Sequence, residues 1–221
     1  MASSSIAVRE LPLFPLPDVV LFPSTPLPLH IFEPRYRIMM STILESDCRF
    51  GVLMADPNQG TVASVGCCAE VIKHQRLPDD RVNILTVGQQ RFRVLEAVRE
   101  KPYLVGLVEW IEDEPPQQEL RPLASQVEEL LKDVVRLSSK LMDQPIELPE
   151  NIPSLPTELS YWIASNLYGA APEQQALLEI RDTAARLERE VEILTSTRSN
   201  LAARTVLKDT FDAESPDSSI S

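Results

Sequence analysis

The sequence predicts an α+β protein in which a β-rich half precedes a helical half. In the first half, apolar residues recur with the period of two that is typical of β-strands. From Gln117 onward the period changes to about 3.6, which is typical of amphipathic helices. The polar, proline-containing segment Glu112–Pro116 separates the two patterns. We therefore expect domains at residues 1–114 and 115–210 and a disordered acidic tail at 211–221.

The stretch Leu11–Arg37 is apolar and contains seven prolines. Proline lacks an N–H and biases the preceding residue toward extended conformations, which argues against a continuous helix and against a central strand. We expect two short extended segments, at roughly 11–16 and 27–32, joined by a corner at Asp18–Pro26. The corner carries four apolar residues inward. They are Val19, Val20, Leu21 and Phe22.

A helix is expected directly after this stretch. It begins at Glu33-Pro34, since proline is well tolerated at the first helical position, and it ends near Glu45–Asp47. Five apolar residues at helical spacing form one buried stripe. They are Tyr36, Met39, Met40, Ile43 and Leu44.

The strands of the first half follow this helix. Phe50–Ala55 is a short strand of the buried type. Val65–Gln75 and Val82–Val87 predict the two arms of a β-hairpin around a polar turn. Lys101–Ile111 predicts the last strand.

Gly88 is expected to break the second arm of the hairpin and to open another strand. The alternation in this strand places Phe92 and Val94 inward and Arg91 and Arg93 outward.

The second half divides into four helices. The first ends before Pro145, and a proline-rich connector leads to a second helix from Thr157 in which Trp162 is expected to be a core anchor. A third begins at Pro172, and a fourth is capped at Asp182. The leucine spacing of the fourth helix fits either burial within its own subdomain or pairing with a second copy.

Composition and charge exclude several function classes. The chain has 33 acidic and 21 basic residues, a net charge of −12, and no basic run that tracks a phosphate backbone, so nucleic acid is not expected as a partner. The excess acid either keeps the protein soluble or attracts basic segments of unfolded clients.

No apolar run reaches the roughly 20 residues of a membrane span, and the N-terminus has no export or transit signal. We expect a soluble, cytoplasmic protein without membrane contact.

The residues that carry chemistry do not form a recognisable catalytic or metal site. The glycines never show the spacing of an ATP-binding phosphate loop, and His30 and His74 lack a third ligand. Ser139 and Lys140 are adjacent on a helix and diverge by about 100°, so the lysine cannot take the serine proton. Three sparse cysteines suit a reducing cytosol, and Cys67 and Cys68 are expected on opposite faces of a strand. We predict neither a cofactor nor a metal.

One motif resembles a known family. Leu13–Pro23, followed by Pro28–Leu29 and Ile31–Tyr36, is similar to the opening signature of the Lon protease N-terminal (substrate-binding) domain family. The order of elements also resembles the small twisted, PUA-like β-barrel of that family. The helices are similar to the helical part that follows the barrel in full-length Lon. The resemblance covers roughly residues 8–208 and implies a free-standing domain without the ATPase and Ser–Lys protease domains.

The resemblance implies a protein that binds polypeptides and is not an enzyme. Its partners would be unfolded or client proteins, and it would serve as an adaptor in degradation or quality control, with a protease or chaperone supplied in trans. The candidate substrate-binding residues are Glu33, Arg35, Tyr36 and Arg37, because the family carries polar and charged residues at this turn and they are expected to be accessible. The alternative for Glu33 and Arg37 is an ion pair that only starts the helix.

Two other functions stay open at this point. A small-molecule or regulatory sensor would use the pocket of the barrel, and a specific metabolite would then stabilise the protein against heat. A hydrolase would need a nucleophile–base pair that the sequence does not reveal.

Overall fold

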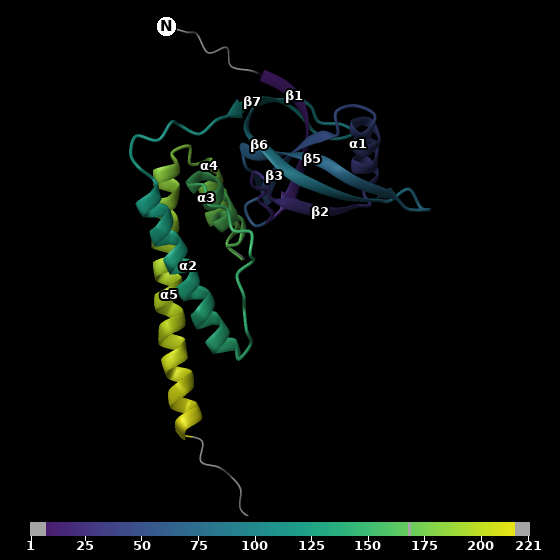
Figure 1. Cartoon of the computed structure of the whole chain (residues 1–221). Coiled ribbons are helices and arrows are strands. Elements are labelled where there is room, and N and C mark those ends of the chain that lie inside the picture. Colours follow the sequence, from purple (N-terminus) through teal and green to yellow (C-terminus); the bar gives the residue numbers. More distant parts are fainter. Residues whose placement is uncertain (1–7, 168, 215–221) are drawn as a thin grey trace, which may run out of the picture. The chain divides into compact units, whose positions relative to one another are not determined.

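The computed structural model describes residues 8–167 and 169–214. These residues form two compact units (Figure 1). The sheet unit contains the chain up to Glu114 and also Tyr161–Arg181. The helical unit contains Pro115–Ser160 and the chain from Asp182. The chain therefore leaves one unit for the other after Glu114, after Ser160 and after Arg181, and each unit is described separately.

The sheet unit is a ring of strands. Its hydrogen-bonded order is β1-β7-β6-β5-β3-β4, and β1 also pairs with β3, which closes the ring. β2 pairs with β6 outside this path. The strands are β1 (Val8–Pro17), β2 (Pro26–Ile31), β3 (Arg49–Asp56), β4 (Thr61–Val62), β5 (Val65–Arg76), β6 (Val82–Arg99) and β7 (Val105–Ile111). The predicted α+β class, with a small twisted ring of strands before the helices, is confirmed.

Strand β1 contains the first of the two predicted extended segments, and its two halves pair with different strands. Val8–Pro12 pairs antiparallel with β7, and Leu13–Pro17 pairs parallel with β3. Because each half is paired on one side only, a missing proline N–H can face the unpaired side.

Strand β6 runs without a break through Gly88, so the predicted strand break at this residue is also wrong. The glycine is required for a different reason. A Cβ atom at Gly88 would lie 2.0 Å from the backbone oxygen of Phe22, a distance that no real Cβ contact reaches. Gly88 therefore lets the proline-rich corner lie directly against β6.

The core of the sheet unit has two parts, one on each face of β5. Helix α1 (Pro34–Leu44), which is confirmed as predicted, buries Met39, Met40 and Ile43 in the larger cluster. Cys67 belongs to that cluster and Cys68 to the other, so the predicted opposite faces are confirmed. Burial raises the pKa of both thiols, that of Cys68 to about 11.

Four helices follow the sheet, as the helical period predicts. They are α2 (Arg121–Met142), α3 (Pro156–Ser165), α4 (Ala171–Glu179) and α5 (Thr183–Glu214). In the helical unit α2 packs against α5. Asp182 caps α5, since its carboxylate accepts a hydrogen bond from the Ala184 N–H at 2.8 Å.

The helices differ from the sequence expectation in two places. The chain enters the sheet unit inside α3, and α4 lies wholly in that unit. Helix α5 continues to Glu214, so residues 211–214, which we expected in the tail, are helical. Residues 215–221 lie outside the described part of the chain. None of the helices within that part has both the length and the hydropathy that crossing a membrane requires.

Candidate functional site

The predicted contact residues lie where α1 begins. The Arg35 guanidinium donates to the Glu33 carboxylate at 2.9 Å and lies 4.5 Å from the centre of the Tyr36 ring. Glu33 therefore pairs with Arg35, and the alternative pairing with Arg37 is not formed. Both partners of the Glu33–Arg35 pair remain accessible to solvent, which limits the energy of the pair to below about 1 kcal/mol.

Tyr36 is the exception among the four, because the expectation that its side chain is accessible is wrong. Its exposed fraction is 6%, and its ring centre lies 4.0 Å from that of Phe14. The residue belongs to the apolar stripe of α1, so the helical period decides its position. Burial raises the pKa of the Tyr36 phenol, while the nearby Arg35 charge acts in the opposite direction.

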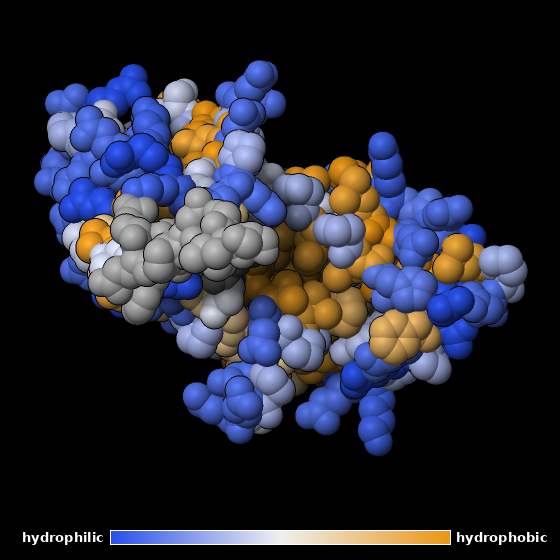
Figure 2. Space-filling model, turned by 90° about the horizontal axis from the view of Figure 1, so that it is seen from below, coloured by the Kyte–Doolittle hydropathy of each residue, from blue (hydrophilic) through white to orange (hydrophobic). Residues whose placement is uncertain are grey.

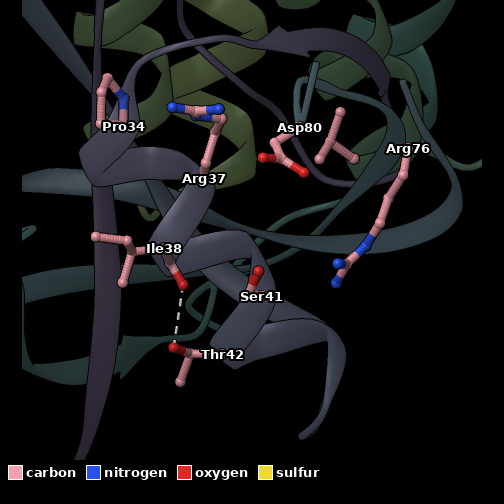
Figure 3. Close-up of a pocket in the computed structure, with 8 residues that line it drawn as sticks. Pro34, Arg37, Ile38, Ser41, Thr42, Arg76 and Asp80 are labelled. Atoms are coloured by element: carbon pink, nitrogen blue, oxygen red, sulfur yellow. Dashed lines mark hydrogen bonds between the residues drawn. The ribbon is translucent and has the colours of Figure 1, made fainter. Parts of the chain in front are cut away.

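Arg37 lines a groove between α1 and the β5–β6 hairpin (Figure 3). Figure 3 places Arg37 and Ser41, from the helix, opposite Asp80 and Arg76, from the hairpin. The groove has a volume of about 470 Å³. We call it the helix–hairpin groove. Its lining residues are Pro34, Arg37, Ile38, Ser41, Thr42, Arg76, Asp80 and Val82.

A second and larger concavity, of about 610 Å³, lies within the sheet unit beside the proline-rich corner. We call it the proline-corner hollow. We call its apolar lining residues the floor; they are Val19, Val20, Leu21, Pro26, Leu27 and Trp162. We call its polar lining residues the rim; they are Asp18, Ser24, Thr25, Ser165, Asn166 and Gln174, and Gly169 completes the lining. Figure 2 shows one face of the molecule, on which hydrophobic atoms gather in patches among hydrophilic ones.

Contacts with α3 and β6 fix the position of the corner that lines the hollow. Phe22 is fully buried, and its ring centre lies 6.3 Å from that of Tyr161 on α3. Two backbone hydrogen bonds join the corner to β6, from the Ser24 N–H to the Gly88 oxygen at 2.8 Å and from the Gly88 N–H to the Thr25 oxygen at 2.9 Å. These contacts hold the wall of the hollow in one position.

Some apolar residues of the corner and of α3 face the hollow instead of the core. Leu21 is buried as predicted, but Val19 and Val20 are half-buried. Trp162 is half-buried as well, so the expectation that it anchors the core is wrong. The sequence pattern identifies these residues as apolar but carries no signal that distinguishes the floor of an open hollow from a closed core.

The free edge of β2 does not favour the addition of another strand. β2 pairs only with β6, and Thr25 and Leu27 direct backbone oxygens toward that side, to Gly88 N–H and to the Thr86 hydroxyl. The alternation along the strand turns Pro26 and Pro28 to the free edge, where neither can donate an N–H. At Pro26 and Pro28 this edge therefore has no N–H group for pairing with another strand.

Arg91 is a residue whose importance the sequence analysis missed. We predicted that it faces outward, but it is 2% exposed. Its guanidinium donates to the backbone oxygens of Leu178 at 2.5 Å and Ile180 at 2.7 Å and forms an ion pair with Asp113. The Tyr161 hydroxyl donates to the same carboxylate at 3.0 Å. This Arg91 cluster fastens the segment that carries one wall of the hollow to β6.

Two of the residues with catalytic potential, Ser139 and His30, make structural contacts. The Ser139 hydroxyl oxygen accepts from the Ile146 N–H at 2.9 Å, which holds the connector after α2. His30 Nδ1 lies 2.6 Å from the Asn83 side-chain oxygen, and His74 is exposed on β5. Among residues 8–167 and 169–214, no three His, Cys, Asp or Glu side chains come together as they would around a metal ion.

Among the described residues of the helical unit, Glu190 is an acid that is buried without a hydrogen-bond partner. Glu190 on α5 is fully buried, and neither carboxylate oxygen accepts a hydrogen bond. Burial raises its pKa well above the usual range, against the opposing effect of the Arg186 charge one turn earlier. The folded state therefore favours the protonated form of Glu190. The stabilisation that this preference gives is fully present below the pKa of about 4.3 that glutamate has in the unfolded chain. It is lost as the pH rises through the higher pKa of the folded state.

We expect Glu190→Gln to gain stability relative to the parent protein as the pH rises from about 4.5 to about 8, because glutamine stays neutral throughout. The measurement is the melting temperature followed by circular dichroism at several pH values. Glu188→Gln, an exposed acid on the same helix, is the matched control. A difference between Glu190→Gln and parent that does not change with pH would contradict the prediction.

The chain forms a ring of strands that is followed by helices, and comparison with known protein families shows to which family it belongs. The family model of the ATP-dependent protease La (LON) substrate-binding domain matches residues 10–196. The chain belongs to this family.

Relatives and solved structures agree with this assignment. The chain is 30% identical over 198 residues to Lon protease 2 from Myxococcus xanthus, covering 86% of this chain and 24% of that protein. It is 30% identical over 196 residues to Lon protease from Anaeromyxobacter dehalogenans (strain 2CP-C), covering 85% and 23%. The chain thus spans about a quarter of the length of these relatives.

Two solved structures have the same fold. A Lon N-terminal domain protein from Xanthomonas campestris is 27% identical with a TM-score of 0.60, covering 82% of this chain and 96% of that one. The N-terminal domain of Lon protease from the Mycobacterium avium complex is 17% identical with a TM-score of 0.59, covering 86% and 98%. The second of these likenesses concerns the fold alone.

Proposed function

We propose that this chain is a non-enzymatic module that binds client or partner polypeptides in the cytoplasm and presents them to a protease or chaperone supplied by another chain. Membership of a substrate-binding domain family supports the recognition part of the proposal. The match covers about a quarter of proteins named Lon protease, which supports a connection with proteolysis.

The observation that carries the proposal is the proline-corner hollow. Its floor of valine, leucine, proline and tryptophan side chains accepts one or two apolar side chains of an extended segment. The hydroxyl and amide groups of the rim meet the polar backbone of that segment. Because the free edge of β2 turns prolines outward, such a segment binds by its side chains and not as an added strand.

The start of α1 is a second contact surface in this proposal. Glu33, Arg35 and Arg37 present charged groups to solvent, and Tyr36 supports Arg35 from the core. We expect these residues to contribute to selectivity more than to affinity, since exposed charges add little binding energy.

The test uses a fluorescently labelled, uncharged peptide with a central Leu-Val-Phe segment flanked by Ser, Gly and Asn, and it measures anisotropy without nucleotide. We expect saturable binding that Val20→Asp weakens about tenfold or more, because a carboxylate in the apolar floor must be desolvated. Removing the other tryptophan by Trp110→Phe leaves Trp162 as the only reporter. Its emission should shift to the blue when the peptide covers the hollow.

Val62→Asp is the matched control, because Val62 is an exposed valine on β4 outside the hollow. This variant should bind the peptide like the parent protein. If the parent does not bind at high micromolar concentration, or if both aspartate variants lose affinity equally, the hollow is not the polypeptide site.

A further inference from the structure

The helix–hairpin groove contains two guanidinium groups that the protein itself does not neutralise. Most exposed arginines of this acidic chain have a carboxylate partner. Such pairs include Arg35–Glu33 at 2.9 Å, Arg49–Glu70 at 2.9 Å and Arg93–Glu109 at 3.1 Å. In the described part of the chain, Arg37 and Arg76 form no ion pair, and both line this groove.

The donors of these two side chains are largely unused. One terminal nitrogen of Arg37 donates to the backbone oxygen of Asp79 at 3.2 Å, and its Nε–H is shielded from water without a partner. Arg76 is exposed, and in the chain that the structure describes its guanidinium makes no hydrogen bond. A guanidinium offers five N–H groups in a planar fork that matches a carboxylate. The groove therefore contains guanidinium N–H groups that can still donate hydrogen bonds to an acidic group.

The charge balance of the groove differs from that of the whole chain. Arg37 and Arg76 face a single acid, Asp80, so the lining carries one net positive charge, whereas the protein carries −12. Arg81 does not alter this balance, because Asp79 accepts from it at 2.5 Å. An anion that enters the groove meets a locally positive surface.

Apolar residues also line the groove. The lining includes Ile38, whose side chain is 50% exposed, and Pro34 from the same helix. Ser41 adds an exposed hydroxyl on the same wall, and Figure 3 shows it one helical turn below Arg37. The lining of the groove thus combines two guanidinium groups with apolar side chains.

We propose that the helix–hairpin groove binds an acidic side chain of an extended polypeptide, with an apolar residue of the same segment against Ile38. The inference rests on the proposed polypeptide-binding function and adds a chemical preference at a separate place on the sheet unit. A segment that combines an apolar stretch with a nearby glutamate or aspartate would be selected over one that carries lysine.

The experiment compares three labelled peptides of one sequence, Leu-X-Ser-X-Leu with glycine-serine flanks, in which X is glutamate, glutamine or lysine. We expect the glutamate peptide to bind most tightly and to lose affinity between low and moderate salt, since its selective contact is a screened charge. Arg76→Gln and Arg37→Gln should each weaken the glutamate peptide about fivefold and leave the glutamine peptide unchanged. Asp80→Asn should strengthen the glutamate peptide, because it removes the one competing carboxylate.

Arg204→Gln is the matched control. Arg204 is also exposed and, in the described chain, without an ion-pair partner, but it lies on α5 in the helical unit. Equal affinities for the glutamate and glutamine peptides, or equal losses in Arg76→Gln and Arg204→Gln, would overturn the inference. If the uncharged peptide still binds the proline-corner hollow in that case, the proposed function stands and only the acidic preference fails.

Discussion

Arg91→Met is expected to lower the free energy of unfolding of the sheet unit by about 3–5 kcal/mol, the usual cost of removing one partner from a buried ion pair. The methionine fills the space but leaves the Asp113 carboxylate without its cation. The backbone oxygens of Leu178 and Ile180 lose their donor as well. Both tryptophans, Trp110 and Trp162, lie in the sheet unit, so urea unfolding followed by their fluorescence reports on this unit.

Two further variants make the Arg91 prediction specific. Arg93→Met, two residues along the same strand, removes an exposed ion pair with Glu109 and should cost less than about 1 kcal/mol. Tyr161→Phe removes only the hydroxyl that donates to Asp113 and should cost about 1.5–3 kcal/mol, and it remains informative if Arg91→Met does not fold. Equal losses in Arg91→Met and Arg93→Met would show that the Arg91 cluster does not fasten the unit.

The sequence predicts those elements whose local signals agree with their surroundings. Helix α1 has a proline at its first position and an apolar stripe of helical spacing, and the structure confirms its bounds closely. The β5–β6 hairpin has alternating apolar residues around a polar turn and is also confirmed. In both cases residues close in sequence determine the outcome, so no knowledge of distant contacts is needed.

Errors arise where a contact far along the chain decides the local structure. Gly88 looks like a strand break, but its role is the close approach of Phe22, which is distant in sequence. The alternation of side chains along β6 predicts that Arg91 faces outward. In the fold, however, α4 covers this face of the strand, and the backbone oxygens at the end of that helix replace water around the guanidinium.

The candidate site was predictable in part. The start of α1 has accessible charged residues, and Arg37 lines a groove there. Arg76 and Asp80 belong to a hairpin that the sequence identifies, but only the fold brings the hairpin turn beside α1. The same is true of Trp162 and Val20, which both line the hollow although they are distant in sequence.

Gly88→Ala should destabilise the sheet unit by about 3 kcal/mol, at the upper end of the cost of an added group in a packed site. In most strands this substitution is neutral or stabilising, because alanine restricts the unfolded chain. Here the new Cβ meets a backbone oxygen at 2.0 Å and the Cys67 sulfur at 3.3 Å. The oxygen belongs to Phe22, whose ring is fully buried, so the corner cannot withdraw without opening the core. Urea unfolding followed by tryptophan fluorescence measures the loss.

Gly60→Ala separates this clash from simple backbone strain. Gly60 has a φ of +66° and no atom within 4 Å of an added Cβ, so its substitution should cost only the roughly 1–2 kcal/mol of a left-handed alanine. The two variants should also differ in binding. Gly88→Ala displaces the corner that carries Val19 and Val20 and should weaken the uncharged apolar peptide even where the protein is folded, whereas Gly60→Ala should bind it normally. Unchanged peptide affinity in folded Gly88→Ala would mean that the position of the corner against β6 does not determine the shape of the hollow.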